Sequence, residues 1–266
     1  MSRYKKTFKE LAKKKQKAFI PFTVVGDPDY KTSIEIVKAM VENGADILEL
    51  GFPFSDPIAD GPTIQAADVR ALKKKINTDD CFKFIEDVRK FTKIPIGLLV
   101  YSNIIYQRGI DKFYKDAAQA GADSILCTEV PPEEAEEYIA AAKKNKIDTV
   151  FIATELTSNE RLNDIVKKTT GFVYVVARLG VTGAQKELGS ATVETLMRIR
   201  PLTKLPLCVG FGISEPKHAK QVIKAGADGV IVGSQIVKII EKNLKNKNKM
   251  IKEVGNFVKK MKEACK

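Results

Sequence analysis

Short apolar runs alternate with longer amphipathic segments along the whole chain. Eight of these runs are rich in branched apolar residues and are bounded by Gly, Pro or Asp, which is typical of buried strands. They cover residues 18–25, 47–50, 94–101, 124–128, 148–153, 172–177, 205–209 and 229–232. Strands that are apolar on both faces indicate a parallel sheet covered by helices.

The segments between these runs carry apolar residues at helical spacing. Helices are predicted at 4–16, 31–43, 66–74, 79–91, 111–120, from 131, at 160–168, 192–200 and 215–224, and from 235. Eight strand–helix units in a chain of 266 residues favour a closed (β/α)8 TIM barrel with an extra N-terminal helix over an open doubly wound sheet. No linker divides the chain, so we expect a single domain over residues 1–266.

A repeated tripeptide supports this arrangement. Gly-Ala-Asp occurs at 44–46, 121–123 and 226–228, each time between a predicted helix and the apolar strands ILEL, SILC and GVIV. Glycine is a natural residue to end a helix. The shared unit is therefore helix, Gly-Ala-Asp, strand.

Charge changes the picture little. Lysine and arginine number 45 against 33 acids, a formal net charge of +12, and the lysines concentrate near the two ends. There they alternate with apolar residues at helical spacing, and the chain has no Trp. Solvated helix faces explain this pattern better than a nucleic-acid surface, so no nucleic-acid partner is expected.

The sequence also predicts where the protein resides. No apolar run approaches the roughly 18 residues that a membrane span needs. The basic N-terminus lacks the apolar core of a signal peptide, so we expect a cytoplasmic protein without a membrane partner.

Residues 44–62, GADILELGFPFSDPIADGP, are the most informative stretch. Glu49 interrupts an apolar strand, where an unpaired carboxylate is costly to bury. Side chains alternate along a strand, so we place Glu49 inside the barrel. There an apolar and phenolic setting would raise its pKa and suit it to carry a proton. A carboxylate held by structural hydrogen bonds is the alternative.

Asp60 lies in the stiff, proline-rich loop that follows this strand. Loops at the C-terminal ends of barrel strands carry the active sites of these folds. Asp followed by Gly61 is also a common turn former, so a purely structural role for Asp60 stays open.

Two glycine-bearing loops predict an anion site. The sequence GFGIS at 210–214 follows the seventh strand, and Gly233-Ser234 follows the eighth and opens a helix. Such loops commonly hold phosphate in these barrels, although glycines also serve as plain turns. The long segment 178–190 has the length of a mobile lid, or of a surface loop.

Missing residue types narrow the chemistry. His218 is the only histidine, and no His or Cys cluster could build a transition-metal site, so no metal is expected. No lysine lies inside a predicted strand, which excludes a Schiff-base aldolase. A carbon–carbon lyase here would use acid–base chemistry.

In order along the chain, ELGFPFSDPIADGPTIQ, IPIGLLVYSNIIYQRG, GVTGA, GFGIS and GSQIVKIIE resemble the tryptophan synthase α-subunit family over residues 19–241. The resemblance implies cleavage of indole-3-glycerol phosphate to indole and glyceraldehyde 3-phosphate, in the last step of tryptophan biosynthesis. It implies no cofactor in this chain. The implied partner is a pyridoxal-phosphate β-subunit, which receives indole in an α2β2 heterotetramer.

The resemblance also implies roles for particular residues. Glu49 would be the acid–base catalyst, and Asp60 would hold the indole N–H and stabilise positive charge on the ring. The implied substrate-binding residues are Phe22, Ile64, Leu99, Tyr101, Tyr174, Thr182, Gly183, Phe211, Gly212, Gly233 and Ser234. Among them Thr182 would approach Asp60, and Gly183, Gly212, Gly233 and Ser234 would contact the phosphate.

Some positions depart from the family pattern: Val24, Glu129, Glu155 and Ala177. They affect the rim of the barrel and the fit to a partner. Two alternatives therefore stay open. One is an activating subunit with vestigial catalysis; the other is a different metal-free, phosphate-binding barrel enzyme.

Overall fold

The computed structural model describes residues 2–177 and 190–266. Within these ranges nine parallel strands form one sheet. They are β1 (Ala18–Val24), β2 (Leu48–Gly51), β3 (Ile96–Val100), β4 (Ser124–Cys127), β5 (Asp148–Thr149), β6 (Phe151–Ala153), β7 (Val173–Val176), β8 (Leu207–Gly210) and β9 (Gly229–Val232).

The sheet closes into a barrel. Its order is β5-β4-β3-β2-β1-β9-β8-β7-β6, so the two outermost strands are β5 and β6. Only Val150 separates them, and together they are the predicted fifth strand, divided in two. The sheet therefore begins and ends on the same stretch of chain, which confirms the predicted eight-unit (β/α)8 barrel.

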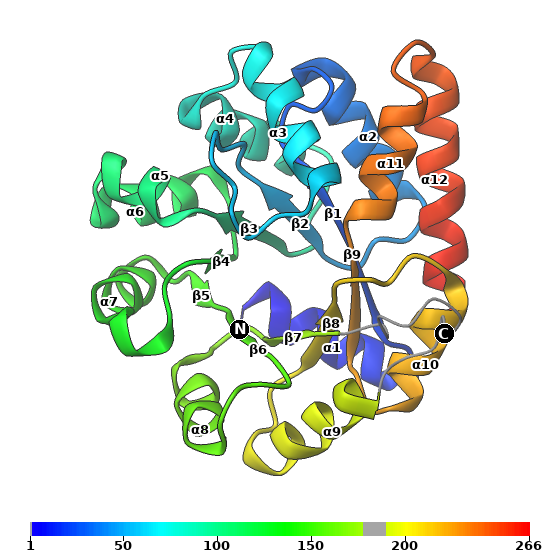
Figure 1. Cartoon of the computed structure of the whole chain (residues 1–266). Coiled ribbons are helices and arrows are strands. Elements are labelled where there is room, and N and C mark those ends of the chain that lie inside the picture. Colours follow the sequence, from blue (N-terminus) through cyan, green and yellow to red (C-terminus); the bar gives the residue numbers. More distant parts are fainter. Residues whose placement is uncertain (1, 178–189) are drawn as a thin grey trace.

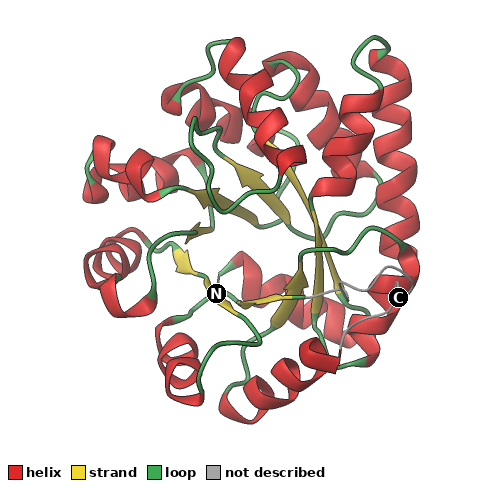
Figure 2. Ribbon diagram, in the orientation of Figure 1, coloured by secondary structure: helices red, strands yellow, loops and turns green. Residues whose placement is uncertain are grey.

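Helices surround the ring of strands (Figures 1 and 2). In the described ranges they are α1 (Arg3–Lys13), α2 (Tyr30–Glu42), α3 (Pro62–Lys73), α4 (Thr78–Arg89), α5 (Ser102–Arg108), α6 (Ile110–Ala120), α7 (Glu136–Asn145), α8 (Asn159–Lys168), α9 (Ser190–Ile199), α10 (Pro216–Lys224), α11 (Ser234–Lys242) and α12 (Lys247–Glu263), with 3-10 turns at Pro132–Glu134 and Arg200–Leu202.

Two predicted helices are wrong in detail, and one short helix is not predicted. α3 begins at Pro62, four residues before the predicted start, because proline fits the first turn of a helix. The helix predicted from residue 131 is a 3-10 turn followed by α7. α5 was missed because its seven residues are too few to show a clear period.

The predicted N-terminal helix is confirmed, and it closes one end of the barrel. Tyr4 and Leu11 of α1 are buried in the same cluster as the inward-facing Ile47 and Phe172. The hydroxyls of Tyr4 and Ser124 lie 2.8 Å apart. Figure 1 shows α1 lying across the centre of the ring. The opposite end, where the strands finish, is the open mouth.

The three Gly-Ala-Asp repeats form one repeated hydrogen-bonding pattern. In each, the Asp carboxylate accepts a hydrogen bond from a backbone N–H at the start of the neighbouring strand. The pairs are Asp46 with Phe19 at 2.8 Å, Asp123 with Ile96 at 2.8 Å and Asp228 with Leu207 at 3.2 Å. The N–H of each Asp donates to the carbonyl of the same partner. These acids therefore join adjacent strands at the closed end.

Candidate active site

Glu49 lies inside the barrel, as the alternation along its strand predicts. In β2 it pairs in register with Phe22 of β1 and Gly97 of β3. Ile47, on the same face, packs in the interior cluster, whereas Leu48 packs against the helices. The Glu49 side chain is 5% exposed, and its strand ends two residues later at the mouth.

Burial, with a smaller contribution from the negative charge of Asp60, raises the pKa of Glu49 to about 8. None of the described residues donates a hydrogen bond to its carboxyl group, so the structural alternative lacks the donors it requires. A carboxyl group with a pKa near neutrality can both accept and return a proton. The position of Glu49 and its raised pKa are therefore compatible with acid–base chemistry.

Asp60 lies beside the same mouth. Its backbone closes a turn, and a hydrogen bond fixes the orientation of its carboxyl group. Its N–H donates to the carbonyl of Pro57 at 3.0 Å, which closes a turn. The Tyr101 hydroxyl donates to Oδ2 of Asp60 at 2.7 Å and accepts from the N–H of Ala59 at 3.1 Å. Burial raises the pKa of Asp60, and the Tyr101 hydrogen bond opposes this.

Apolar side chains line the mouth around Glu49. The ring of Phe22 packs against Gly51 and Gly233, where a Cβ atom would lie 2.7 and 2.9 Å from it. Gly210 is required for a similar reason, because a Cβ there would overlap the Tyr174 hydroxyl. The charges of Glu49 and Asp60 both help to raise the pKa of Tyr174, which places this phenol near both acids.

Two further predicted residues flank this lining. Leu99 is half-buried and packs against both the interior cluster and the cluster beneath the helices. Ile64 is buried in the first turn of α3, directly after the Asp60 loop.

The predicted anion loops lie at the ends of β8 and β9. Phe211 has φ 67° and Gly212 has φ 72°, so two consecutive residues after β8 have positive, left-handed φ angles. This conformation is strained for a bulky residue such as Phe. Phe211 is 47% exposed, and its ring meets that of Tyr174 edge-on at 6.1 Å.

The second anion loop opens a helix. Gly233 precedes the first turn of α11, and Ser234 is the first helical residue. The first N–H groups of a helix have no intrahelical partner and attract anions. Thr182, Gly183 and the predicted lid at 178–190, except its last residue, lie outside the described residues.

The departures from the family pattern have simple structural settings. Glu129 accepts hydrogen bonds from the N–H and hydroxyl of Ser102, at 2.8 and 2.7 Å, and so fixes the start of α5. Val24 and Ala177 are buried and pack in the core. Glu155 lies in the loop between β6 and α8.

Asp68 is a third acid near the mouth, which the sequence reasoning missed. It lies on the buried face of α3 with Ile64, Ala67 and Ala71, at helical spacing. It is 4% exposed, and burial raises its pKa to about 8. An acid on an otherwise apolar helix face is a signal that could have found it.

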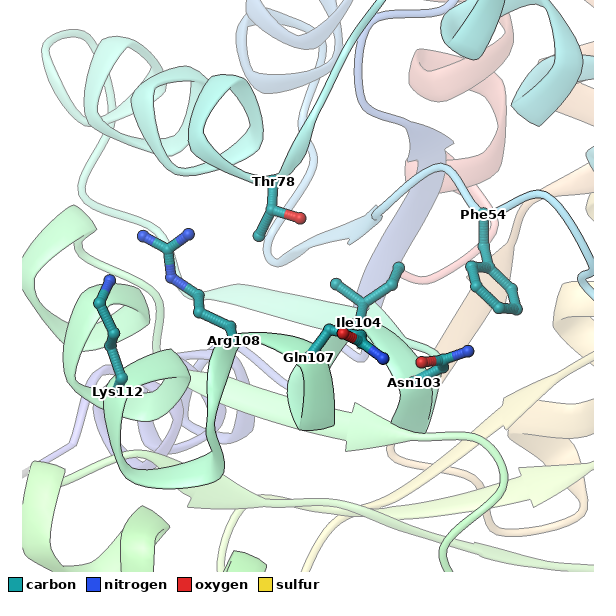
Figure 3. A pocket seen from close by; sticks show the side chains of 7 residues that line it. All are labelled: Phe54, Thr78, Asn103, Ile104, Gln107, Arg108 and Lys112. Atoms are coloured by element: carbon teal, nitrogen blue, oxygen red, sulfur yellow. The ribbon is translucent and has the colours of Figure 1, made fainter.

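An open surface pocket of about 680 Å³ lies outside the mouth, and Glu49 and Asp60 do not line it. It is formed mainly by α5, with the start of α4 and the loop after β2. Figure 3 shows Arg108 and Lys112 at one side of this pocket and Phe54 and Asn103 at the other. This pocket and the mouth of the barrel are therefore separate features, and the loop that contains Phe54 contributes to both.

Residues 2–177 and 190–266 contain no group of three or more His, Cys, Asp or Glu side chains placed to hold a metal ion. In the same ranges, no helix has the length and apolar character required to cross a lipid bilayer.

Fold and site together define a (β/α)8-barrel enzyme with a buried carboxyl group of raised pKa at the mouth of the barrel. Residues 8–266 match the family model described as "Tryptophan synthase alpha chain". The chain belongs to this family.

Individual relatives agree with the family model. Tryptophan synthase alpha chains of Methanothermobacter thermautotrophicus and Vibrio vulnificus are 49% and 46% identical to this chain. The matches cover 93% and 99% of this chain and 92% and 99% of those proteins. The crystal structure of subunit alpha from Legionella pneumophila has a TM-score of 0.91 at 34% identity, over 100% of this chain and 98% of that one.

A structure of the tryptophan synthase a2b2 complex from Pyrococcus furiosus also matches. Its TM-score is 0.87 at 37% identity, over 92% of this chain and 98% of that chain. As a family member, the chain is a carbon–carbon lyase of tryptophan biosynthesis that cleaves indole-3-glycerol phosphate.

Proposed function

We propose that Glu49 carries the protons in this cleavage and that Asp60 stabilises the charge that develops on the indole ring. Protonation of ring carbon C3 places positive charge on the indole nitrogen, next to the Asp60 carboxylate. Glu49 then takes the proton of the glycerol hydroxyl. The carbon–carbon bond breaks, its electron pair returns to the ring, and indole and glyceraldehyde 3-phosphate result.

The observation that carries this proposal is the position of Glu49. It is buried at the end of β2 with a pKa raised to about 8, so one group can alternate between donor and acceptor near neutral pH. Asp60 is close enough for its charge to act on Glu49, and the Tyr101 hydroxyl holds one of its oxygens. The second oxygen is left to meet the indole N–H.

Replacing Glu49 tests the assignment directly. Glu49→Gln preserves size but cannot ionise, so we expect indole formation to fall by at least about 10³-fold while substrate binding persists. Asp60→Asn keeps a polar group of the same shape and is expected to lose less, about 10²-fold. Steady-state indole formation and ligand titration measure both. Near-wild-type turnover by Glu49→Gln would contradict the proposal.

We also propose a phosphate site formed by Gly212, Gly233 and Ser234, with Phe211 beside it. The left-handed backbone at Phe211 and Gly212 and the start of α11 support this, because both present backbone N–H groups at one side of the mouth. Phe22, Ile64, Leu99, Tyr101 and Tyr174 would surround the indole ring. Thr182 and Gly183 are assigned from the family resemblance alone.

We further propose that the chain acts as one domain in the cytoplasm, without a cofactor of its own, and assembles with a pyridoxal-phosphate β-subunit into an α2β2 heterotetramer. The a2b2 complex of the Pyrococcus furiosus relative supports this. The Asp60 loop also presents Ile58 with 81% of its surface exposed. An exposed apolar side chain at the mouth is suited to a protein partner.

Mixing the chain with a β-subunit from a relative tests assembly. We expect an α2β2 mass by light scattering and faster indole formation. Ile58→Asp should weaken the complex at least tenfold, whereas Leu244→Asp, between α11 and α12, should not. Equal binding by both variants would place the interface elsewhere.

A further inference from the structure

The buried carboxyl group of Asp68 is not explained by the chemistry above. The backbone N–H of Phe54, in the loop after β2, lies close enough to this carboxyl group to lower its pKa. The Oδ2 atom of Asp68 is fully buried and has no hydrogen-bond partner among the described residues. Keeping such a group in a helix face costs stability, which indicates that it has a use in the molecule.

Contacts lead from Asp68 to Asp60 through two aromatic rings. Phe54, whose backbone N–H lies near the Asp68 carboxyl group, stacks on Tyr101 with ring centroids 5.0 Å apart and planes 22° apart. The hydroxyl of Tyr101 donates to Asp60 at 2.7 Å. α3 also holds the far end of the loop, because Gln65 donates to the carbonyl of Asp60 at 2.8 Å.

We propose that Asp68 is a positioning residue for the lyase reaction, which sets the place of the Asp60 carboxyl group through Phe54 and Tyr101. The inference rests on the proposed role of Asp60. Without a polar acceptor at position 68, the Phe54 N–H loses this neighbour, and the Phe54 end of the loop is no longer held against α3. Tyr101 then loses the ring against which it packs, and the Asp60 carboxyl group moves relative to Glu49.

Burial and the surrounding charges favour the neutral form of Asp68. Burial contributes most to raising its pKa to about 8, the charges of Asp60 and Asp27 add to this, and Arg70 opposes it. Asp68 is therefore protonated at neutral pH and places no second charge beside Asp60. Asn has the same shape, is neutral and can accept the Phe54 hydrogen bond, so it should replace this acid.

The test compares three substitutions on α3 at pH 7. We expect Asp68→Ala to lower kcat at least tenfold with a smaller change in KM, because Asp60 acts on charge that appears during the reaction. Asp68→Asn should stay within about twofold of wild type. Val69→Ala, at the neighbouring exposed position, is the matched control and should leave both constants unchanged.

A double-mutant cycle separates positioning from a general loss of structure. In an Asp60→Asn background, Asp68→Ala should cost less than about threefold, because its effect passes through Asp60. An equal loss in both backgrounds would overturn the inference. If Asp60→Asn has no effect by itself, the proposed function has failed, and not this inference alone.

Phe54→Leu provides a second route if Asp68→Ala does not fold. It leaves α3 intact and removes the ring that stacks on Tyr101. We expect a fall in kcat of the same size, again reduced in the Asp60→Asn background. Wild-type kcat in a folded Phe54→Leu variant would overturn the proposed connection.

Discussion

Glu49 illustrates how a single residue can serve function at the expense of stability. Its unfolded-state pKa is near the ordinary 4.5, whereas burial raises the folded-state pKa to about 8. Between these values the unfolded chain has released its proton and the folded chain has kept it. Folding then requires proton uptake, so this group makes the folded state less stable as pH rises from about 4.5 to 8.

Removing the ionisable group should therefore stabilise the protein at high pH. We expect Glu49→Gln to raise the free energy of unfolding at pH 8 by about 1–3 kcal/mol relative to wild type, and to change it little at pH 4.5. Asp68 also has a raised pKa. In the Gln variant, the decrease in the free energy of unfolding with rising pH should therefore be smaller than in wild type but still present. Urea unfolding at several pH values measures this. A less stable Gln variant at pH 8 would show that burial is not the main cost.

At the scale of elements, ion pairs extend the Gly-Ala-Asp pattern to the helices. Asp46 contacts Lys262 of α12 at 2.8 Å, Asp123 contacts Arg89 of α4 at 2.5 Å, and Asp228 contacts Arg200 at 2.6 Å. Each acid thus holds a neighbouring strand by its backbone and a cationic side chain from another part of the chain. The same tripeptide performs the same task three times.

The pair that docks α12 can be tested alone. Lys262 is 8% exposed and is the cation paired with Asp46, whose carboxylate is itself largely buried. Lys262→Met should lower the free energy of unfolding by about 3 kcal/mol, because it leaves a buried carboxylate uncompensated. Lys260→Met, on the exposed face of the same helix, should change it by less than about 0.5 kcal/mol. Equal effects would show that helix packing alone docks α12.

Sequence patterns predicted the strands better than the contacts between loops. Burial on both faces leaves a continuous apolar signal, so all eight strand positions and the inward face of Glu49 could be predicted. The hydrogen bond from Tyr101 to Asp60 could not, because it depends on the path of a loop between two prolines. Asp68 is not predicted, because the helix is expected to begin only at residue 66, and without Ile64 the apolar face on which Asp68 lies is not apparent.

Across the whole molecule, the two ends of the barrel differ in kind. At one end α1 inserts Tyr4 and Leu11 among the inward-facing strand residues, and the three Asp residues join the strands. At the other lie Glu49, Asp60 and the loops after β8 and β9. This separation assigns stability to one end and chemistry to the other, as expected of such barrels.

The position of α1 limits how substrate can enter the barrel and how products can leave it. Because α1 fills the far end of the barrel, the substrate and both products must all enter and leave through the mouth. One product must leave before the next substrate can enter. A partner bound over the mouth would therefore control the order in which substrate binds and products leave, without contacting Glu49.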